Sequence, residues 1–273
     1  MPIARRPFLS LPLVVQQAVR ERTGAINSAR TVRGGSNSSV AACLDTEKGR
    51  VFVKGLHDGH PQIGTLLREA EINRHLPDAC PRLMWRVQVK GWELLGYQFL
   101  AGRHADYRPG SPDLHLVRAA LTEVQCLTVP PRARVLSAQE RWASYAAPGT
   151  ADLFAGDALL HTDLAPDNVL VAERACLVDW AWPTRGAAWI DPAIWALRLL
   201  AAGHTPQEAD AAAGAFPSWK RADDISKSAF ATASARLWGE IADNDPAAWK
   251  YRMARSSVLF AAFLDRVRHR APG

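Results

Sequence analysis

The chemically most informative part of this sequence is the stretch from residue 161 to residue 171, which reads HTDLAPDNVLV. An acid, Asp163, and a carboxamide, Asn168, stand five residues apart on a predicted loop, and a short apolar strand follows. A further acid, Asp179, comes eleven residues after Asn168 in the segment LVDW. Mg²⁺ binds a few carboxylate or carbonyl oxygens together with phosphates and water. The pattern therefore predicts a Mg²⁺ site that directs a hydroxyl at a phosphate.

The residues before this stretch predict a small β-rich unit that would position it. Apolar runs separated by turn-forming residues predict strands at Ala29–Arg33, Val40–Leu44, Arg50–Lys54, Leu83–Val89 and Trp92–Phe99. Apolar residues at helical spacing predict a helix over residues 61–76 and an earlier one over residues 11–22, which ends at Gly24. A five-stranded antiparallel sheet with one inserted helix therefore fits residues 25–100.

Beyond Gly102 the sequence pattern is mostly helical. Capping residues indicate helix starts at Ser111 with Pro112, Ser137, Asp191 with Pro192, Thr205, and Asp245 with Pro246. The segment from Asn168 to Asp179 is expected to be one strand-like element between these helices. We therefore expect an α+β chain, with a β-rich N-lobe at residues 1–100 and a larger α-rich C-lobe at residues 101–273.

Taken in order, these motifs resemble the aminoglycoside phosphotransferase family, whose fold is that of the protein kinases. The family's catalytic loop reads H-G-D-x-x-x-x-N and its metal-binding segment reads D-W or D-F, and both are matched here at the usual spacing. Three further motifs of the family are matched. Residues 34–38 match the nucleotide-covering loop, and Lys54 with Arg68-Glu69 matches the phosphate-binding lysine and its partner helix. Residues 186–192 match the G-D-P segment. The resemblance runs from about residue 25 to residue 200 and implies a two-lobed, protein-kinase-like fold.

The resemblance implies a role for each residue of the catalytic loop and the metal-binding segment. Asp163 would accept or orient the proton of the acceptor hydroxyl, while Asn168 and Asp179 would hold Mg²⁺. The nucleotide phosphates would be covered by the backbone and hydroxyls of Ser36, Asn37 and Ser38.

The resemblance also implies how the sheet binds ATP or GTP. Lys54 would bind the α- and β-phosphates and be oriented by Glu69, although helical phase leaves Glu71 as an alternative partner. Tyr97 falls at the gatekeeper position, with Gln98 as the alternative if the strand is shifted by one residue. The main chain from Gln98 to Leu100 would form the hinge that bonds the purine.

The sequence departs from the family and from the protein kinases at several positions. Thr162 stands where the family has glycine, and Ala181 stands where the metal segment carries a third-position glycine. Ala165 occupies the position of the phosphate-binding lysine of Ser/Thr protein kinases, and no A-P-E element follows. These departures favour a small-molecule kinase. The absence of G-x-x-x-x-G-K-[ST] excludes a P-loop phosphotransferase.

We therefore expect an enzyme that moves the γ-phosphate of ATP or GTP to a hydroxyl of a small molecule, for example an antibiotic that it inactivates. A metabolic kinase of the same fold, acting on choline, a sugar or an amino alcohol, is the alternative within enzymes. A nucleotide-binding pseudokinase scaffold is the third hypothesis, and the intact site residues argue against it. Residues 152–273 carry 13 basic and 15 acidic side chains, so a polycationic acceptor is not favoured over a neutral one.

Several other residues have both a structural and a functional interpretation. His161 is expected to bond backbone around the catalytic loop. Trp182 or Trp219 would either pack in the core or wall an acceptor pocket. Asp223-Asp224 would be a solvated turn or an acidic acceptor-binding patch. The scattered cysteines are expected to be buried free thiols: Cys43, Cys80, Cys126 and Cys176.

The composition is that of a globular protein. Of 273 residues, 48% are hydrophobic and 22% charged. No apolar run of about 18 residues predicts a membrane span, and the N-terminal segment favours an amphipathic helix over a signal peptide, so we expect a cytoplasmic protein without a membrane partner. The net charge of +6 includes no long basic run, so no nucleic-acid partner is expected. We expect a monomer or a weak dimer.

Overall fold

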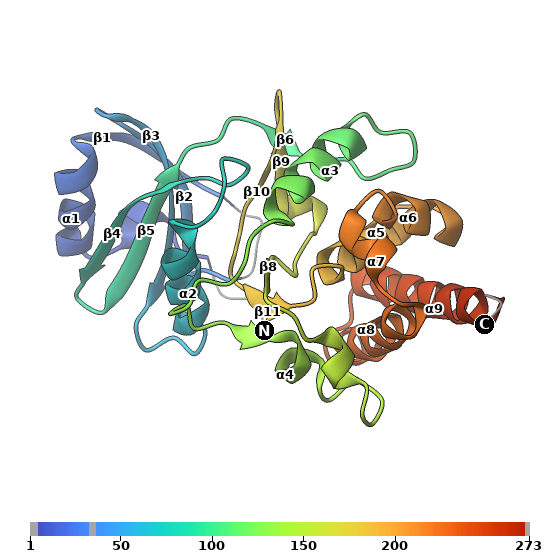
Figure 1. Cartoon of the computed structure of the whole chain (residues 1–273). Coiled ribbons are helices and arrows are strands. Elements are labelled where there is room, and N and C mark those ends of the chain that lie inside the picture. Colours follow the sequence, from blue (N-terminus) through green and yellow to red (C-terminus); the bar gives the residue numbers. More distant parts are fainter. Residues whose placement is uncertain (1–4, 33–36, 271–273) are drawn as a thin grey trace.

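The computed structural model describes residues 5–32 and 37–270 of the chain. An antiparallel sheet lies in the N-terminal part, and a helical region follows it (Figure 1). The sheet has the order β1-β2-β3-β5-β4, and its strands are β1 (Ile26–Thr31), β2 (Val40–Thr46), β3 (Gly49–His57), β4 (Leu83–Val89) and β5 (Trp92–Gln98). The predicted five-stranded antiparallel sheet is confirmed, with its first strand beginning three residues before the predicted Ala29.

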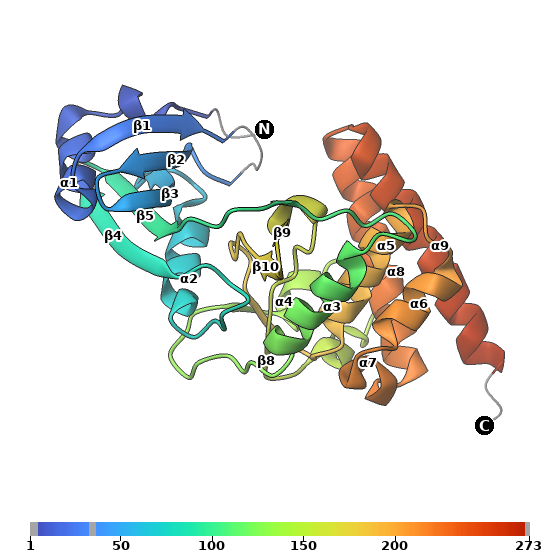
Figure 2. The same cartoon turned by 90° about the horizontal axis from the view of Figure 1, so that it is seen from above.

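Two helices cover opposite faces of this sheet (Figure 2). Helix α1 (Leu13–Thr23) and the 3-10 turn Phe8–Ser10 cover one face, and α2 (Ile63–Asn73), inserted between β3 and β4, covers the other. Because side chains alternate along a strand, Val51 and Val53 of β3 pack on the α1 side while Phe52 packs on the α2 side. Lys54 therefore also faces α2, inside the molecule.

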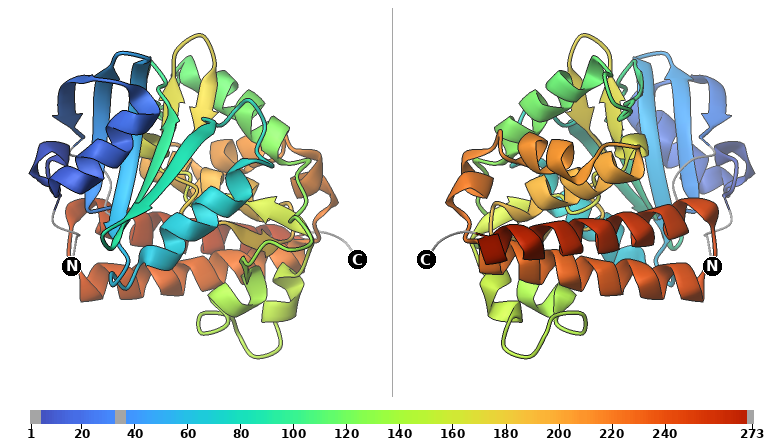
Figure 3. Two further views of the ribbon diagram at one scale, coloured as in Figure 1. Left: turned by 90° about the vertical axis from the view of Figure 1, so that its left-hand side faces the viewer. Right: turned by 90° about the vertical axis from the view of Figure 1, so that its right-hand side faces the viewer.

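The region after the sheet contains seven α-helices among the described residues. They are α3 (Asp113–Val124), α4 (Ala138–Trp142), α5 (Ile190–Ala201), α6 (Pro206–Ala213), α7 (Pro217–Arg221), α8 (Asp224–Asn244) and α9 (Ala248–Arg270). Helices α8 and α9 lie side by side as a long pair (Figure 3). Large aromatic side chains such as Trp195, Phe216 and Phe230 are fully buried between the helices.

Six short strands, one before α3 and five between α3 and α5, carry the segments predicted to be the catalytic loop and the metal-binding segment. They are β6 (Arg103–His104), β7 (Leu136–Ser137), β8 (Ala158–Leu160), β9 (Val169–Val171), β10 (Ala175–Leu177) and β11 (Thr184–Gly186), with 3-10 turns at Ala151–Phe154 and Pro166–Asn168. The segment from Asn168 to Asp179 is β structure as expected, and it consists of two strands, β9 and β10, paired as an antiparallel hairpin. The hairpin places Asn168 and Asp179 at its two outer ends.

Two of the predicted helix caps are confirmed, and the other three are corrected. Ser137 and Thr205 each form a capping box with the glutamate three residues later. Asp191 is not a cap, because it lies inside α5 and accepts backbone hydrogen bonds from the catalytic loop. Asp245 follows the end of α8 and pairs with Lys250. Helix α3 begins at Asp113, whose amide donates to the hydroxyl of Ser111 at 3.2 Å.

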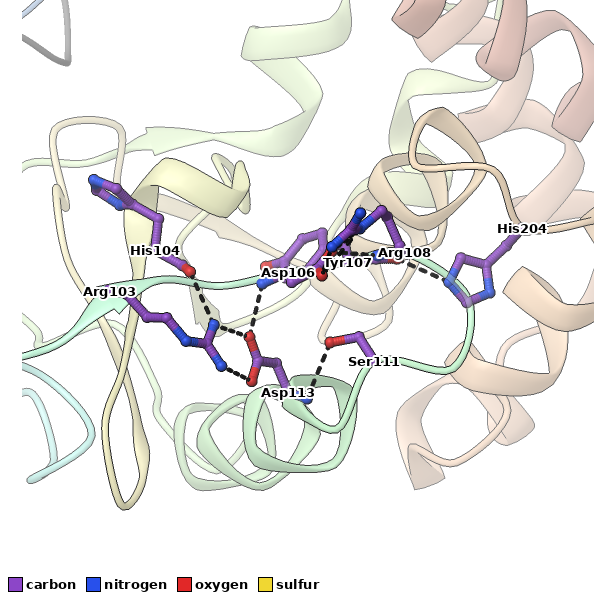
Figure 4. A network of polar contacts seen from close by, with 8 residues as sticks. All are labelled: Arg103, His104, Asp106, Tyr107, Arg108, Ser111, Asp113 and His204. Carbon is purple, nitrogen blue, oxygen red and sulfur yellow. Dashed lines mark hydrogen bonds and ion pairs between the residues drawn. The ribbon is translucent and has the colours of Figure 1, made fainter.

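The linker between the sheet and α3 is held by a polar network around Asp113 (Figure 4). The guanidinium of Arg103 donates to both carboxylate oxygens of Asp113, at 2.5 and 2.7 Å, and the amide of Asp106 donates to the same group at 2.8 Å. Nε2 of His204, which follows α5, lies 2.9 Å from the carbonyl oxygen of Tyr107. These contacts fix the linker, including β6, against the helical region.

The cysteines differ in exposure, so the expectation of four buried thiols is wrong. Cys80 is buried, Cys43 and Cys176 are partly exposed, and Cys126 at the end of α3 is exposed. All four are free thiols, as expected. Within residues 5–32 and 37–270, none of the helices combines the length and the apolar character needed to cross a bilayer.

Candidate active site

The centre of the site is the ammonium group of Lys54, which contacts two carboxylates. Strand β3 holds Lys54 so that its Nζ lies 2.8 Å from Oε2 of Glu69 on α2 and 2.6 Å from Oδ1 of Asp179, just after β10. Lys54 and Glu69 are 7% and 4% exposed. Glu69, not Glu71, is therefore the helix residue that pairs with Lys54.

Burial and charge act against each other in this cluster. Burial lowers the pKa of Lys54, but the charges of Asp179 and Glu69 outweigh it and raise that pKa above its ordinary value. Burial raises the pKa of Glu69, whereas the charge of Lys54 holds the pKa of Asp179 below its ordinary value despite burial. The lysine is therefore firmly protonated, and Asp179 is an anion at neutral pH.

A cavity of about 400 Å³ lies between the sheet and the β9–β10 hairpin, next to this cluster. It brings together the described nucleotide- and metal-binding candidates, which are Asn37, Ser38, Lys54, Glu69, Tyr97, Gln98, Leu100, Asn168 and Asp179. Ser36, the remaining predicted nucleotide contact, lies outside the described residues. Sequence reasoning missed Arg5, His104 and Asp167, which also line the cavity.

Tyr97 and Gln98 occupy opposite faces of β5, which settles their orientation. The Tyr97 side chain is 2% exposed, lines the cavity and packs with Leu56, Leu66 and Leu95 on the α2 side. Burial, followed by the charge of Glu69, raises the pKa of Tyr97 well above its ordinary value. The Gln98 side chain is exposed, and the backbone N–H of Gln98 donates to the carbonyl of Arg82 at 2.8 Å. Gln98 belongs to the predicted hinge, but its backbone N–H is already bonded and cannot donate to a purine.

The catalytic loop is held by hydrogen bonds to its own backbone. His161 is fully buried; its Nδ1 accepts from the amide of Asp163 at 3.2 Å, so the ring proton lies on Nε2, which donates to the carbonyl of Val178 at 3.0 Å. Nδ2 of Asn168 donates to the carbonyl of Asp163 at 3.0 Å. His161 thus bonds backbone as expected, and Asp163 is linked to both ends of the hairpin.

Thr162 adopts a backbone conformation that favours glycine. Its φ of 64° is in the left-handed region, which costs a residue with a β-carbon about 1 kcal/mol or more. Its hydroxyl donates to the carbonyl of Trp182 at 2.8 Å and accepts from the guanidinium of Arg141. Its amide donates to Asp191 at 2.9 Å. These bonds hold a conformation that glycine, the family's residue, would adopt without strain.

A buried residue, Asp191, and a partly buried one, Arg141, support this loop, and sequence reasoning assigned neither to the site. Asp191 is 1% exposed and accepts from the amides of His161 and Thr162 at 2.8 and 2.9 Å. Arg141 on α4 also bonds the hydroxyl of Thr184, and burial lowers its pKa to about 10. Nothing in the local sequence around Arg141 signals this position, because its partners lie at least 21 residues away.

Asp163 is paired with a cation from α5. Nη2 of Arg198 lies 3.0 Å from Oδ1 of Asp163, and the guanidinium lies 5.1 Å from the ring centre of Trp238 on α8. The Asp163 side chain is 30% exposed, so it is accessible at the surface of the loop. Arg198 follows Asp191 by two helical turns, a spacing that places both on one face of α5 and could have indicated their shared contact with the loop.

The structure gives different positions to the other residues considered for acceptor binding. Trp219 is 3% exposed and stacks on Phe260, so it is a core residue and does not wall a pocket. Trp182 is partly buried, with the Arg141 guanidinium 5.5 Å from its ring centre. Asp223 is the N-cap of α8, where its carboxylate accepts from the amide of Ser226 at 2.7 Å. The acidic pair is therefore a capped helix start.

The donor set of the cavity fits Mg²⁺. Asp179 and Asn168 both line the cavity and offer hard oxygen atoms. The described residues contain no cluster of three or more His, Cys, Asp or Glu side chains suited to a metal ion. Mg²⁺ held by Asp179 and Asn168 would take its remaining ligands from phosphate and water.

Comparison with known proteins gives matches at the level of structure. No protein-family model matches the chain, and no curated protein matches it in sequence. The choline kinase LicA from Streptococcus pneumoniae aligns with a TM-score of 0.62 at 12% identity, covering 92% of this chain and 98% of LicA. Aminoglycoside phosphotransferase APH(4)-Ia aligns with a TM-score of 0.61 at 12% identity, over 90% of this chain and 98% of its own.

A third match is an aminoglycoside phosphotransferase from Alicyclobacillus acidocaldarius, with a TM-score of 0.56 at 15% identity over 96% of this chain and 98% of that chain. A thermostable mutant of APH(4)-Ia, with a TM-score of 0.56 at 11% identity, was solved in a ternary complex with ADP and hygromycin B. The chain therefore has the protein-kinase-like fold of these small-molecule phosphotransferases.

Proposed function

We propose that this protein is a Mg²⁺-dependent phosphotransferase that moves the γ-phosphate of ATP or GTP to a hydroxyl of a small molecule. The observation that carries the proposal is the buried Lys54 ammonium in contact with both Glu69 and Asp179, at the wall of a cavity of about 400 Å³. An ammonium bound on two sides by carboxylates is pre-positioned for phosphate oxygens that approach from the cavity. The fold of small-molecule phosphotransferases supports the same reaction class.

The cavity residues divide between the two ends of the nucleotide. Lys54, Asn37 and Ser38 would contact the phosphates, with Glu69 orienting the lysine. Tyr97 and the main chain up to Leu100 would contact the purine. Asn168 and Asp179 would hold Mg²⁺, which when bound neutralises charge on the phosphates.

Asp163 is the proposed proton acceptor for the phosphoryl transfer. The acceptor hydroxyl oxygen forms a bond to the γ-phosphorus, the bond from that phosphorus to the β–γ bridging oxygen breaks, and the nucleoside diphosphate leaves. The hydroxyl proton passes to the carboxylate of Asp163. Arg198 bonds Oδ1 of this carboxylate, and Oδ2 has no hydrogen-bond partner within the described residues, so Oδ2 is the atom positioned to receive the proton.

The charges around Asp163 favour a neutral or anionic acceptor over a polycation. Arg198 contacts Asp163 directly, and the partly buried Arg141 is close enough for the charge of Asp163 to raise the pKa of Arg141 against the effect of burial. A polycationic acceptor would have to approach these two guanidinium groups. We therefore propose a neutral or weakly charged acceptor such as a sugar, a nucleoside or a peptide antibiotic.

The test is Mg²⁺-dependent hydrolysis of ATP and GTP, followed by an acceptor screen with the matched Asp163→Asn variant. The panel contains neutral and peptide antibiotics, polycationic aminoglycosides, and choline, sugars and amino alcohols. Phosphorylation of an antibiotic supports a resistance or self-protection role, and phosphorylation of choline, a sugar or an amino alcohol supports the metabolic alternative. Nucleotide binding without turnover on any compound, with or without Mg²⁺, would identify a pseudokinase.

A further inference from the structure

The N-terminal segment reaches the phosphate end of the nucleotide cavity. Two consecutive contacts join it to the loop before β2: the amide of Arg6 donates to the carbonyl of Ser39 at 2.7 Å, and Nη1 of Arg5 donates to the carbonyl of Ser38 at 2.5 Å. The buried side chain of Phe8 packs under the sheet and anchors the segment there. Arg5 is thus held by the fold next to Ser38, the last residue of the predicted nucleotide-covering loop.

The Arg5 side chain points inward and its neighbour points outward. Arg5 is partly buried and lines the cavity, whereas Arg6 is exposed, as expected for successive residues of an extended segment. Burial lowers the pKa of the Arg5 guanidinium, and the negative charge of Asp179 opposes that effect. Arg5 and Asp179 therefore line the same cavity, close enough for their charges to interact.

The charges of the cavity show why a further cation is useful at this end. Its basic lining residues are Arg5, Arg30 and Lys54, and its acidic ones are Glu69, Asp167 and Asp179. Lys54 already contacts two carboxylates, so the cluster of Lys54, Glu69 and Asp179 is negative on balance. Nucleotide phosphates bring more negative charge, and an arginine at their edge can donate charge-assisted hydrogen bonds.

We propose that Arg5 is a phosphate-binding residue of the nucleotide site, supplied by the N-terminal segment from outside the motifs of the catalytic region. Its guanidinium bridges the carbonyl of Ser38 and the phosphates of the bound nucleotide, so the N-terminal segment and Ser38 bind the phosphates from the same side. The inference rests on the proposed nucleotide-binding function. It assigns to residues before α1 a part in binding that none of the sequence motifs predicts.

The test is calorimetric titration of the full chain with Mg²⁺-ADP and, separately, with adenosine, which has no phosphate. In Arg5→Gln, glutamine keeps a donor for the Ser38 carbonyl but loses the charge. We expect ADP to bind about tenfold more weakly, the range for losing a charged hydrogen bond at a partly exposed site, with adenosine affinity unchanged. Arg5→Lys should keep most of the ADP affinity, and the neighbouring Arg6→Gln is the matched control that should bind both ligands like wild type.

The outcomes separate this inference from the proposed function. Wild type that binds neither ligand overturns both. Wild type that binds ADP, together with an Arg5→Gln variant of equal ADP affinity, overturns the inference alone. Equal losses of ADP and adenosine affinity also overturn it, because they indicate that Arg5 only holds the loop. A thermal melt of each variant verifies that the chain is folded under the titration conditions.

Discussion

Replacing Lys54 with methionine would leave the carboxylates of Glu69 and Asp179 in place without the ammonium that contacts both. Methionine keeps the length and most of the apolar contacts of the lysine stem, so the change isolates the charge. Because Lys54 and Glu69 are almost fully buried, we expect the free energy of unfolding to fall by about 3–5 kcal/mol, the usual cost of removing one partner of a buried ion pair. In a chain of this size the melting temperature should fall by roughly 6–20 °C.

The pH dependence of this loss has a definite sign. Without Lys54, we expect the pKa values of both carboxylates to rise above their ordinary 4.5 and 3.8, because burial and mutual repulsion then outweigh the smaller effects of His161 and Arg5 on Asp179 and of Tyr97 on Glu69. A group whose folded-state pKa is raised contributes stability below its unfolded pKa and loses it as pH rises through the folded pKa. The deficit of Lys54→Met should therefore be small near pH 4 and reach its full size by pH 8.

The assay is chemical denaturation at pH 5 and pH 8, with the exposed Lys220→Met as control. The double variant Lys54→Met/Glu69→Gln removes one of the two carboxylates left without a cation. It should recover about 1–2 kcal/mol of the lost free energy of unfolding at pH 8. A Lys54→Met variant within about 1 kcal/mol of wild type at both pH values would refute the reasoning, as would a double variant less stable than the single one.

Three further predictions concern activity. Asp163→Asn should lower kcat about 10²–10⁴-fold while ADP affinity by calorimetry stays within twofold, and a variant with a tenth of wild-type turnover would contradict the proton-acceptor role. Asp179→Ala should abolish Mg²⁺-dependent turnover and Asn168→Ala should reduce it less, measured as rate against Mg²⁺ concentration; unchanged metal dependence in Asp179→Ala would require another metal site. Tyr97→Ala should raise kcat/KM for ATP relative to GTP, by an amount equivalent to about 1–3 kcal/mol, because it removes a ring beside the proposed purine pocket. Strict ATP use by both wild type and variant would show that Tyr97 does not control the pocket.

The sequence predicts those parts of the fold that depend on residues close together in the chain. Strand alternation and turn residues predict all five strands of the sheet, and the capping boxes at Ser137 and Thr205 predict two helix starts. The choice between Glu69 and Glu71 depends on which face of α2 is buried. In the structure Glu69 is buried on α2 together with Leu66 and Ile72, whereas Glu71 is partly exposed, so packing makes the choice that helical phase leaves open.

The rest depends on contacts between distant parts of the chain. Asp191 lies in the G-D-P match and has the sequence of a helix cap, but its hydrogen bonds to amides about thirty residues earlier depend on how α5 packs against the loop. Arg198 contacts Asp163 across 35 residues, and Arg5 contacts Ser38 across 33. The hairpin at 169–177 was missed because its two short strands are separated by a brief turn within one mostly apolar run.

The attachment of the catalytic loop to α5 has a consequence for how this protein would acquire new acceptors. Asp191 and Arg198 are two turns apart on α5 and contact the loop at two points, while α5 packs against α6, α8 and α9. A small shift of α5 caused by repacking of those helices would move the carboxylate of Asp163 relative to the nucleotide cavity. Directed evolution towards a new acceptor should therefore select substitutions in the α6–α9 core that touch no ligand and change kcat while leaving nucleotide KM unaltered.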